Sequence, residues 1–369
     1  MERLLVLGAG AGQLGLLSAA RARGLFVIAV DRNPRAPGFR FADRRAIVSV
    51  EDEPIVERLA EAERVDGLIA PGAHWPVGAA ARIASKLGLP HPISPETAVL
   101  SASKLRQRER LAEAGIPQTR WQVVSRADEA IQVPCLVRPP DRQGRRARAL
   151  VRSSRELRSA VRAALRASRI GLALVEELAD QPVVTVTAFS RAGVFHPLVA
   201  TDRVPLAHVW ESEHADEAIV LAARAAEALG IREGPSITQI GIGRGGPLVL
   251  ELSARIGGGH EPELCEAALG VDLHGLAIAA ALGKEIPAKR LRPKHRAGGA
   301  CVRFLTGNGE ADGLARAEAM PGVAWARVYG GSDRAGALLA VGAGRDEALE
   351  RATQAAECIR FRAADAHAV

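Results

Sequence analysis

The feature that most restricts the fold is a run of glycines that follows an apolar strand at the start of the chain. The first strand and turn read LLVLGAGAGQLG, which places Gly10, Gly12 and Gly15 in the spacing G-x-G-x-x-G. Asp31 ends the next apolar stretch, FVIAVD. A strand that turns through glycines into a helix begins a parallel βαβ unit. Such glycines allow close approach of a pyrophosphate, but tight packing of the turn also needs them, so a bound dinucleotide is left open.

Strand and helix patterns alternate over about the first 90 residues, which predicts a parallel sheet with helices on both faces. The segment GLPHPISPETAVLSASK, rich in proline and serine, then indicates a connector. Beyond it the chain carries β-rich stretches, a long helix and a hairpin, followed by a small α+β tail. We therefore predict an α/β chain with a Rossmann-like domain over residues 1–95, an α+β domain over 96–297 and a small C-terminal α+β domain over 298–369.

Composition indicates a globular chain and argues against a nucleic-acid partner. The chain has 369 residues, of which 48% are hydrophobic and 25% charged, enough for two or three domains with separate cores. Its net charge of +7 comes mostly from arginines interleaved with glutamates in KLRQRERLAEAG and SSRELRSAVRAALRASR, a pattern that predicts solvated helix faces. Aromatic residues make up only 3%, too few for a base-stacking surface. The positive charge therefore favours a phosphate-bearing small substrate.

Neither secretion nor a membrane location is expected. The N-terminus MERLLVLGAG lacks a signal-peptide pattern, and no apolar run reaches the roughly 18 residues that span a bilayer. The four cysteines are scattered without a CxxC pair, which fits neither a disulfide framework nor a zinc site. We therefore predict a cytoplasmic protein with no membrane or nucleic-acid partner, and a homodimer is left open.

Two adjacent strands, SITQIGIG and PLVLELSAR, are the first candidate for chemistry. Because side chains alternate along a strand, Glu251, Ser253 and Arg255 are expected on one face. In an antiparallel hairpin, Gln239 can lie level with Glu251. A carboxylate and a side-chain amide, with several coordination sites left for phosphates, indicate a magnesium (or manganese) nucleotide site. A solvent-facing glutamate on a strand is the alternative interpretation.

Cationic residues and a loop upstream suit a triphosphate. Arg138 ends the apolar strand of PCLVRPP, and the loop that follows carries Gly144, Arg145 and Arg146. Backbone amides and guanidinium groups are typical ligands of phosphate, although an ordinary basic turn would look the same. This loop, from Asp141 to Arg148, is expected to become ordered around the nucleotide.

The strand LALVEEL places Glu176, Glu177 and Leu178 at its end. Their backbone groups are expected to bind the edge of an adenine.

Taken in this order, the segments resemble the ATP-grasp superfamily over nearly the whole chain. The opening GAGAGQLG with VDRNPRAPGFRFADR is similar to the first domain of the phosphoribosylaminoimidazole carboxylase family, in which the glycine turn does not hold NAD. SASKLRQRERLAEAGIP resembles the segment with the first phosphate-binding lysine, here Lys104. The C-terminal stretch from GGSDRAG to ECIRF is similar to a portion shared by biotin carboxylase and the amino-acid ligases.

The resemblance implies roles for single residues. Arg138 stands where most of the superfamily has lysine and carbamoyl-phosphate synthetase has arginine. Gln239 matches a metal ligand that is usually acidic but is glutamine in carbamoyl-phosphate synthetase. Glu251 matches the central bridging carboxylate, and Arg255 the arginine of the E-x-N-x-R motif.

Two positions depart from the family pattern, and one stretch is ambiguous. Val183 stands where a glutamate usually binds the ribose hydroxyls, and Ser253 replaces the usual asparagine ligand. Both changes bear on nucleotide affinity more than on the fold. The stretch IGGGHEPELC is expected to line the acceptor pocket, although His260 fits a structural hydrogen-bonding role equally well.

The resulting hypothesis is an ATP- and magnesium-dependent carboxylate–amine ligase that acts through an acyl phosphate. Arg255 and Arg146 are the predicted catalytic residues, and small carboxylate and amine molecules are the predicted substrates. Three alternatives remain: an enzyme that activates bicarbonate, a nucleotide-binding protein without turnover, and the NAD-dependent oxidoreductase that the opening glycines first indicate.

Overall fold

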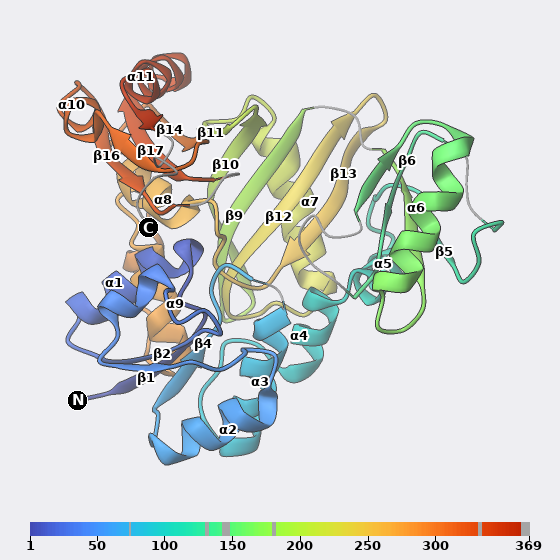
Figure 1. The fold of residues 1–369 in the computed structure, drawn as a ribbon, viewed down its shortest axis with the longest axis horizontal. Helices are drawn as coiled ribbons and strands as arrows, with labels where there is room; N and C mark the ends of the chain where they lie inside the picture. Colours follow the sequence, from blue (N-terminus) through green and yellow to red (C-terminus); the bar gives the residue numbers. More distant parts are fainter. Residues whose placement is uncertain (74, 130–132, 142–147, 179–181, 331–333, 363–369) are drawn as a thin grey trace, which may run out of the picture.

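The structure is a computed structural model, and it describes residues 1–73, 75–129, 133–141, 148–178, 182–330 and 334–362. Its elements form a parallel sheet, a large antiparallel sheet and a small subdomain that projects to one side (Figure 1). None of the helices in the described ranges is long and apolar enough to cross a membrane.

The N-terminal sheet is parallel, as the alternating pattern predicts. Its strand order is β3-β2-β1-β4, and helices cover both faces. Alternate residues of β1 serve the two faces: Leu5 and Leu7 pack toward α2 and α3, whereas Leu4 and Val6 pack toward α1 and the distant helix α9. The elements are β1 (Arg3–Leu7), α1 (Leu14–Ala22), β2 (Phe26–Val30), β3 (Arg44–Ala46), α2 (Glu53–Ala62), β4 (Gly67–Ile69), α3 (Trp75–Leu87) and α9 (Leu273–Ala281).

The central sheet has eight strands in the order β13-β12-β9-β10-β11-β14-β17-β16. Strands from the expected middle and C-terminal domains therefore share one sheet, with β11 paired to β14. Helix α7 packs on one face, α8 on the other, and α11 against β14 and β17. The elements are β9 (Val183–Arg191), β10 (Val194–Val204), β11 (Ala207–Trp210), α7 (Ala215–Ala228), β12 (Gly234–Gly243), β13 (Gly246–Ser253), α8 (Glu261–Leu269), β14 (Gly299–Leu305), β16 (Val323–Val328), β17 (Gly336–Gly342) and α11 (Arg345–Glu357).

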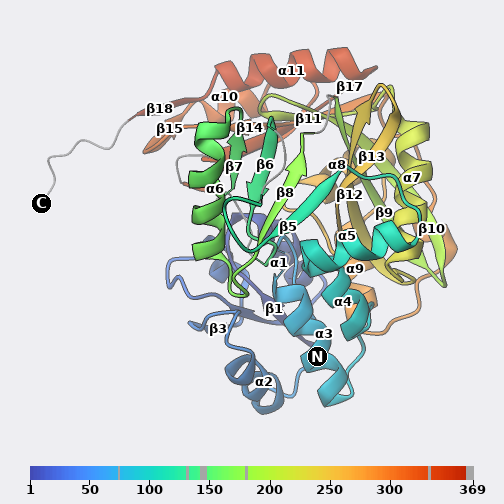
Figure 2. The ribbon, with the colours of Figure 1, turned by 90° about the vertical axis from the view of Figure 1, so that its right-hand side faces the viewer.

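A small subdomain, residues 121–177, forms its own antiparallel sheet in the order β5-β8-β6-β7. It lies in front of the central sheet in Figure 2, with α6 along one side. Buried side chains such as Val137 and Val161 form its separate core. The elements are β5 (Trp121–Val124), β6 (Cys135–Arg138), β7 (Ala149–Val151), α6 (Ser154–Ala167) and β8 (Ala173–Glu177).

Short elements complete the chain. Helices α4 and α5 connect the N-terminal sheet to the central sheet, and a two-stranded sheet of β15 and β18 lies near the C-terminus with α10. Their bounds are α4 (Pro95–Ala102), α5 (Lys104–Glu113), β15 (Glu310–Asp312), α10 (Leu314–Glu318), β18 (Arg360–Arg362) and the 3₁₀ turns Ala11–Gln13, Pro37–Phe41 and Ala288–Leu291.

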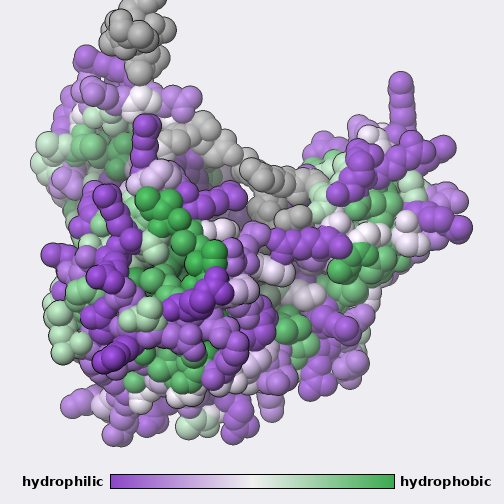
Figure 3. All heavy atoms as spheres, turned by 60° about the horizontal axis from the view of Figure 1, so that its bottom comes forward, coloured by the Kyte–Doolittle hydropathy of each residue, from purple (hydrophilic) through white to green (hydrophobic). Residues whose placement is uncertain are grey.

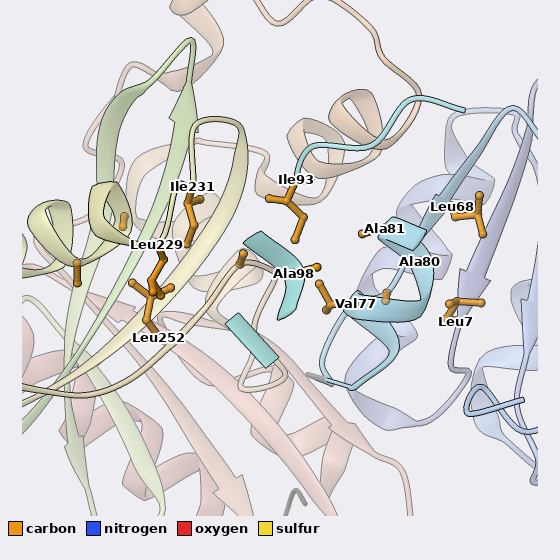
Figure 4. Packing of buried hydrophobic residues seen from close by; sticks show 14 of the residues in the cluster. Leu7, Leu68, Val77, Ala80, Ala81, Ile93, Ala98, Leu229, Ile231 and Leu252 are labelled. Atoms are coloured by element: carbon orange, nitrogen blue, oxygen red, sulfur yellow. The ribbon is translucent and has the colours of Figure 1, made fainter. Parts of the chain in front are cut away.

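One hydrophobic core runs across the connector between the first two predicted domains. Figure 4 shows Leu68 and Val77 on the N-terminal side, Ala98 of α4 in the middle, and Leu229 and Leu252 on the side of the central sheet. All five side chains are buried. Because the connector is itself packed into this core, it holds the two parts together. The domain limits at residues 95 and 297 stay predictions.

Charged side chains are distributed over the surface. Hydrophilic residues cover much of the face shown in Figure 3, interrupted by apolar patches. Arg155, Arg158 and Arg162 of α6 are exposed, as predicted for a solvated helix face. The same prediction is wrong for Arg108 of α5, whose side chain is only 3% exposed. All four cysteines are free thiols, and three of them are buried.

Candidate active site

A cleft of about 910 Å³ lies between the small subdomain and the central sheet. Arginines from both sides line it, together with Glu176, Glu251 and Gln239. Apolar side chains from the small subdomain and the central sheet also line it: Leu136, Leu150, Leu178, Val183 and Leu250. The volume and the mixture of apolar walls with a few polar groups are typical of a small-molecule site.

Lys104 is placed by the cap of α5. The Ser103 hydroxyl accepts a hydrogen bond from the Arg106 N–H, so the helix begins at Lys104. The Lys104 N–H donates to the Pro140 carbonyl, which ties α5 to the segment after β6 (3.2 Å). Its Nζ lies 4.0 Å from Oε1 of Glu251. Burial lowers the pKa of Lys104, and the nearby Glu251 carboxylate opposes this.

Glu176 joins two arginines at the base of the cleft. Its carboxylate, 3% exposed, accepts hydrogen bonds from Arg138 Nε (2.5 Å) and from Arg108 Nη2 (2.7 Å). Burial by itself would raise the pKa of Glu176, but the two guanidinium groups outweigh it and hold the pKa below its ordinary value. The Glu176 side chain therefore positions Arg138 and is not available to a ligand.

The predicted adenine-binding role fits Glu177 poorly. Its side chain is 46% exposed and pairs with Arg120 at 2.9 Å. Its backbone N–H donates to the Arg120 carbonyl, also at 2.9 Å, so this donor is already used within the protein. Leu178 does line the cleft. The adenine contact of these three residues remains a prediction that rests mainly on Leu178.

The hairpin of β12 and β13 brings the predicted metal ligands together. Gln239 pairs directly with Glu251, as the two-strand pattern predicts. Immediately after this pair the register shifts, and Leu250 has no partner on β12. Arg108 stabilises the irregularity, because its Nη1 donates to the Val249 carbonyl and its Nη2 to the Leu250 carbonyl (2.8 and 2.7 Å).

Glu251 is the carboxylate that meets the cationic residues. Its Oε2 lies 3.7 Å from Nη1 of Arg138, and its side chain is 22% exposed. Ser253 lies two residues further along β13, on the same face, and is buried. In the described part of the chain no group of three or more His, Cys, Asp or Glu residues could hold a metal. The oxygen donors of Glu251, Gln239 and Ser253 instead suit a magnesium ion that takes its remaining ligands from phosphates.

Arg255 lies beyond the end of β13 at Ser253, so the alternation that predicted its face does not extend to it. Its guanidinium nevertheless lies within electrostatic reach of Glu251. Nη1 donates to the Ile256 carbonyl (2.8 Å), and within the described ranges the buried Nε has no hydrogen-bond partner. Burial lowers the pKa of Arg255. An anionic ligand could accept from this guanidinium.

Part of the predicted site lies outside the described residues. Gly144, Arg145 and Arg146 belong to residues 142–147, so the predicted phosphate loop and the catalytic role of Arg146 stay predictions. Arg148, the last residue of that loop, and Arg152 of the following segment line the cleft.

The N-terminal glycine turn packs against the protein itself. Asp31 accepts hydrogen bonds from the N–H groups of Ala9 (3.0 Å) and Asn33 (2.9 Å), which engages both carboxylate oxygens. A Cβ on Gly12 would lie only 3.7 Å from the Cα of Gly258. The turn therefore packs against the glycine stretch after Arg255. Asp31 binds backbone N–H groups, whereas the corresponding acid of a dinucleotide-binding unit would bind the ribose.

His260 makes contacts within the protein that fit a structural role, one of the two interpretations left open by the sequence. Its Nε2 lies 2.6 Å from the Tyr329 hydroxyl, and its Nδ1 lies 3.3 Å from Oε1 of Glu263. These contacts connect the start of α8 to the segment after β16. Burial by itself would raise the pKa of Glu263, but the interactions of its carboxylate with His260 and His274 outweigh burial and hold the pKa well below its ordinary value.

Sequence reasoning missed Arg203 and His208, which lie in register on β10 and β11. Nη1 of Arg203 donates to Oε1 of Gln239 (3.1 Å). Burial lowers the pKa of His208 to about 4, although its Nδ1 lies 3.7 Å from Glu261. No local motif marks either residue, because only the pairing of β9 with both β10 and β12 brings Arg203 within reach of the hairpin.

Replacing His208 with phenylalanine is expected to make stability less sensitive to acid. In the folded protein this histidine protonates near pH 4, but in the unfolded chain near 6.5, so the parent loses stability as the pH falls between these values. The loss is roughly 3 kcal/mol, since a pH unit between the two pKa values corresponds to about 1.4 kcal/mol. Urea unfolding at pH 7 and pH 4.5 measures it. An equal loss in parent and variant would contradict a buried neutral His208.

Comparisons with known proteins agree with this arrangement. No family model matches the chain. An uncharacterized protein from Sinorhizobium fredii is 27% identical over 67% of this chain and 56% of its own length, so the chain spans little more than half of that relative. A formate-dependent phosphoribosylglycinamide formyltransferase from Burkholderia vietnamiensis is 29% identical over 95% of this chain and 94% of its own.

Solved structures match over the full length. The L-amino acid ligase from Bacillus licheniformis superposes with a TM-score of 0.83 and 18% identity over 99% of each chain. The carboxyaminoimidazole ribonucleotide synthase from Aspergillus clavatus, solved with ATP, superposes with a TM-score of 0.80 and 15% identity over 97% of this chain and 98% of its own. The likeness to these solved structures shows that the chain has the fold of these enzymes.

Proposed function

We propose that the protein is an ATP- and magnesium-dependent ligase that joins a carboxylate to an amine through an acyl phosphate. The observation that carries the proposal is the position of Glu251. Its carboxylate faces the cleft with Gln239 level beside it, and Lys104 and Arg138 lie 4.0 and 3.7 Å away. Cationic side chains and a metal-binding carboxylate thus meet at one point, as transfer of a γ-phosphoryl group requires.

The cleft offers distinct places for the parts of ATP. Apolar side chains of the small subdomain and the central sheet, among them Leu136, Leu178 and Val183, would contact the adenine. Leu150 is 52% exposed at the cleft, as expected of a side chain that a flat ring would cover. Because Val183 offers no hydrogen bond, the ribose hydroxyls would depend on other groups.

Lys104 and Arg138 would neutralise the phosphates, and Glu251, Gln239 and Ser253 would hold magnesium. When bound, the metal screens the phosphate charge and withdraws electrons from the γ-phosphorus. Arg255 would bind two oxygens of the attacking carboxylate, since its planar guanidinium presents donors in a fork. The carboxylate oxygen attacks the γ-phosphorus, ADP leaves, and the amine then displaces phosphate from the acyl carbon.

Hydroxylamine tests this proposal because it traps an acyl phosphate as a hydroxamate. With ATP and magnesium, at least one member of a panel of amino, keto and simple aliphatic acids is expected to give equal amounts of ADP and hydroxamate. ADP formed only with bicarbonate would favour the bicarbonate-activating alternative, which Arg138 and Gln239 also suit. Nucleotide binding without ADP formation across the panel would favour a protein without turnover, the interpretation that Val183 and Ser253 motivate.

A further inference from the structure

Arg203 lies at the metal site although no motif marks it. Across the sheet, Thr201, Thr185, Gln239 and Glu251 form one row of paired residues. Arg203 is two residues beyond Thr201 on β10, so its side chain points to the same face. Its Nη1 reaches Oε1 of Gln239 at 3.1 Å. The amide oxygen that would bind a metal therefore already accepts a hydrogen bond from a cationic side chain.

A metal on the same oxygen would lie close to this guanidinium. Magnesium binds its ligands at about 2.1 Å, so an ion on Gln239 Oε1 would lie within about 5 Å of the Arg203 Nη1. Two positive charges at that separation repel strongly in a partly buried site. Arg334 and Arg148 add to the positive charge near Arg203.

The donor set also supplies little charge to hold two metal ions. Glu251 is a carboxylate, but Gln239 and Ser253 are neutral, and Glu251 already faces Lys104 and Arg138. One divalent cation together with Lys104, Arg138 and Arg203 already matches the five negative charges of Glu251 and a tetraanionic triphosphate. Arg148 and Arg152 of the cleft and the nearby Arg255 add further positive charge, so a second divalent cation would only increase the excess.

We propose that this nucleotide site takes one divalent cation, bound by Glu251, and that the Arg203 guanidinium occupies the place of a second cation at Gln239. The inference rests on the proposed use of ATP with a metal. Arg203 then contributes a permanent charge, and its remaining N–H groups are available to phosphate oxygens. Arg203 thus determines how many metal ions the nucleotide site binds.

Electron paramagnetic resonance with Mn²⁺ and the β,γ-imido analogue of ATP tests the inference without turnover. Two manganese ions that share a site couple and give a spectrum distinct from that of one ion. The parent is expected to give the uncoupled spectrum even at excess Mn²⁺. The double variant Arg203→Ala with Gln239→Glu removes the fixed cation and adds a carboxylate, and it is expected to bind a second Mn²⁺ and give the coupled spectrum.

The matched control is the double variant Arg162→Ala with Gln239→Glu, which keeps Arg203 and alters an exposed arginine of α6 instead. Its Mn²⁺ spectrum should stay uncoupled. Circular dichroism checks that each variant is folded. A coupled spectrum in the parent would overturn the inference, and so would an uncoupled spectrum in the folded double variant. No protein-bound Mn²⁺ in the parent with the analogue present would instead contradict the proposed function, so the two failures are distinguishable.

Discussion

Replacing Glu251 with glutamine is expected to lower ligase turnover by about a hundred- to thousandfold while the chain stays folded. The substitution keeps the shape of the side chain but removes the negative charge that would attract the metal, and Gln239 and Ser253 offer only neutral dipoles in its place. Loss of a single electrostatic group at a transition state has a cost of this size in other enzymes. Glu251 also faces Lys104 and Arg138, so its charge helps to hold both cations in the cleft.

The measurement is hydroxamate formation with ATP, magnesium and the best carboxylate of the panel. Glu113→Gln is the matched control, because Glu113 is an exposed residue at the end of α5, and its turnover should equal that of the parent. Gln239→Glu, which supplies the acid that the family resemblance implies at this position, should keep measurable activity. Undiminished turnover in Glu251→Gln would contradict the metal assignment and the case for catalysis at this site.

Replacing Glu176 with glutamine is expected to destabilise the protein by about 3 to 5 kcal/mol. Arg108 and Arg138 are both buried, and both donate to this carboxylate. Removing one member of a buried ion pair leaves uncompensated charge, which has a cost of this order. Arg108 also supports the irregular register at Leu250 through the Leu250 carbonyl, so the damage should extend to the hairpin.

Glu177, the next residue, provides the control. Its side chain is half-exposed and pairs with the exposed Arg120, so Glu177→Gln should change the free energy of unfolding little. Urea unfolding at pH 7 compares the two variants. Because the pKa of Glu176 is lower in the folded state, its contribution is present above its ordinary pKa of 4.5 and is lost as the pH falls below that value. Equal stability of the two variants would show that the buried triad does not hold the site.

The local patterns in the sequence were sufficient for the elements and for part of the site. The short connection between the two strands predicted a hairpin in which Gln239 can lie level with Glu251, but this pairing also depends on the register shift at Leu250, because the register of the turn alone would pair Gln239 with Leu250. The alternating strands and helices of the first 90 residues likewise predicted the parallel N-terminal sheet. In the hairpin, and between β1 and β2 and between β2 and β3, the contacts join strands that follow one another in the chain, whereas β1 also pairs with the later strand β4.

Contacts between distant segments were not predictable in this way. Arg108 looks like its exposed neighbours in a helix rich in arginine and glutamate, yet it is buried because Glu176 and the carbonyls of β13 come from far along the chain. Glu176 and Glu177 are identical residues in one strand, and only the packing of the small subdomain decides which of them is buried. Helix α9 covers the N-terminal sheet although some 200 residues separate them, a pairing that no local period records.

By itself, the sequence determined the type and order of the secondary structure and supplied the residues that we propose as oxygen donors for a metal and as cations for phosphate, because these depend on residue type and on spacing along one element. The tertiary structure alone decided which charges neutralise one another: Glu176 with two arginines, Asp31 with backbone N–H groups, and Arg203 with Gln239. The physical reason is that burial makes an unpaired charge costly, so each buried charge needs a partner that is close in the folded chain. Which residues of β6, β8, β10 and β12 are close is set by sheet pairing, and the local sequence pattern does not contain that pairing.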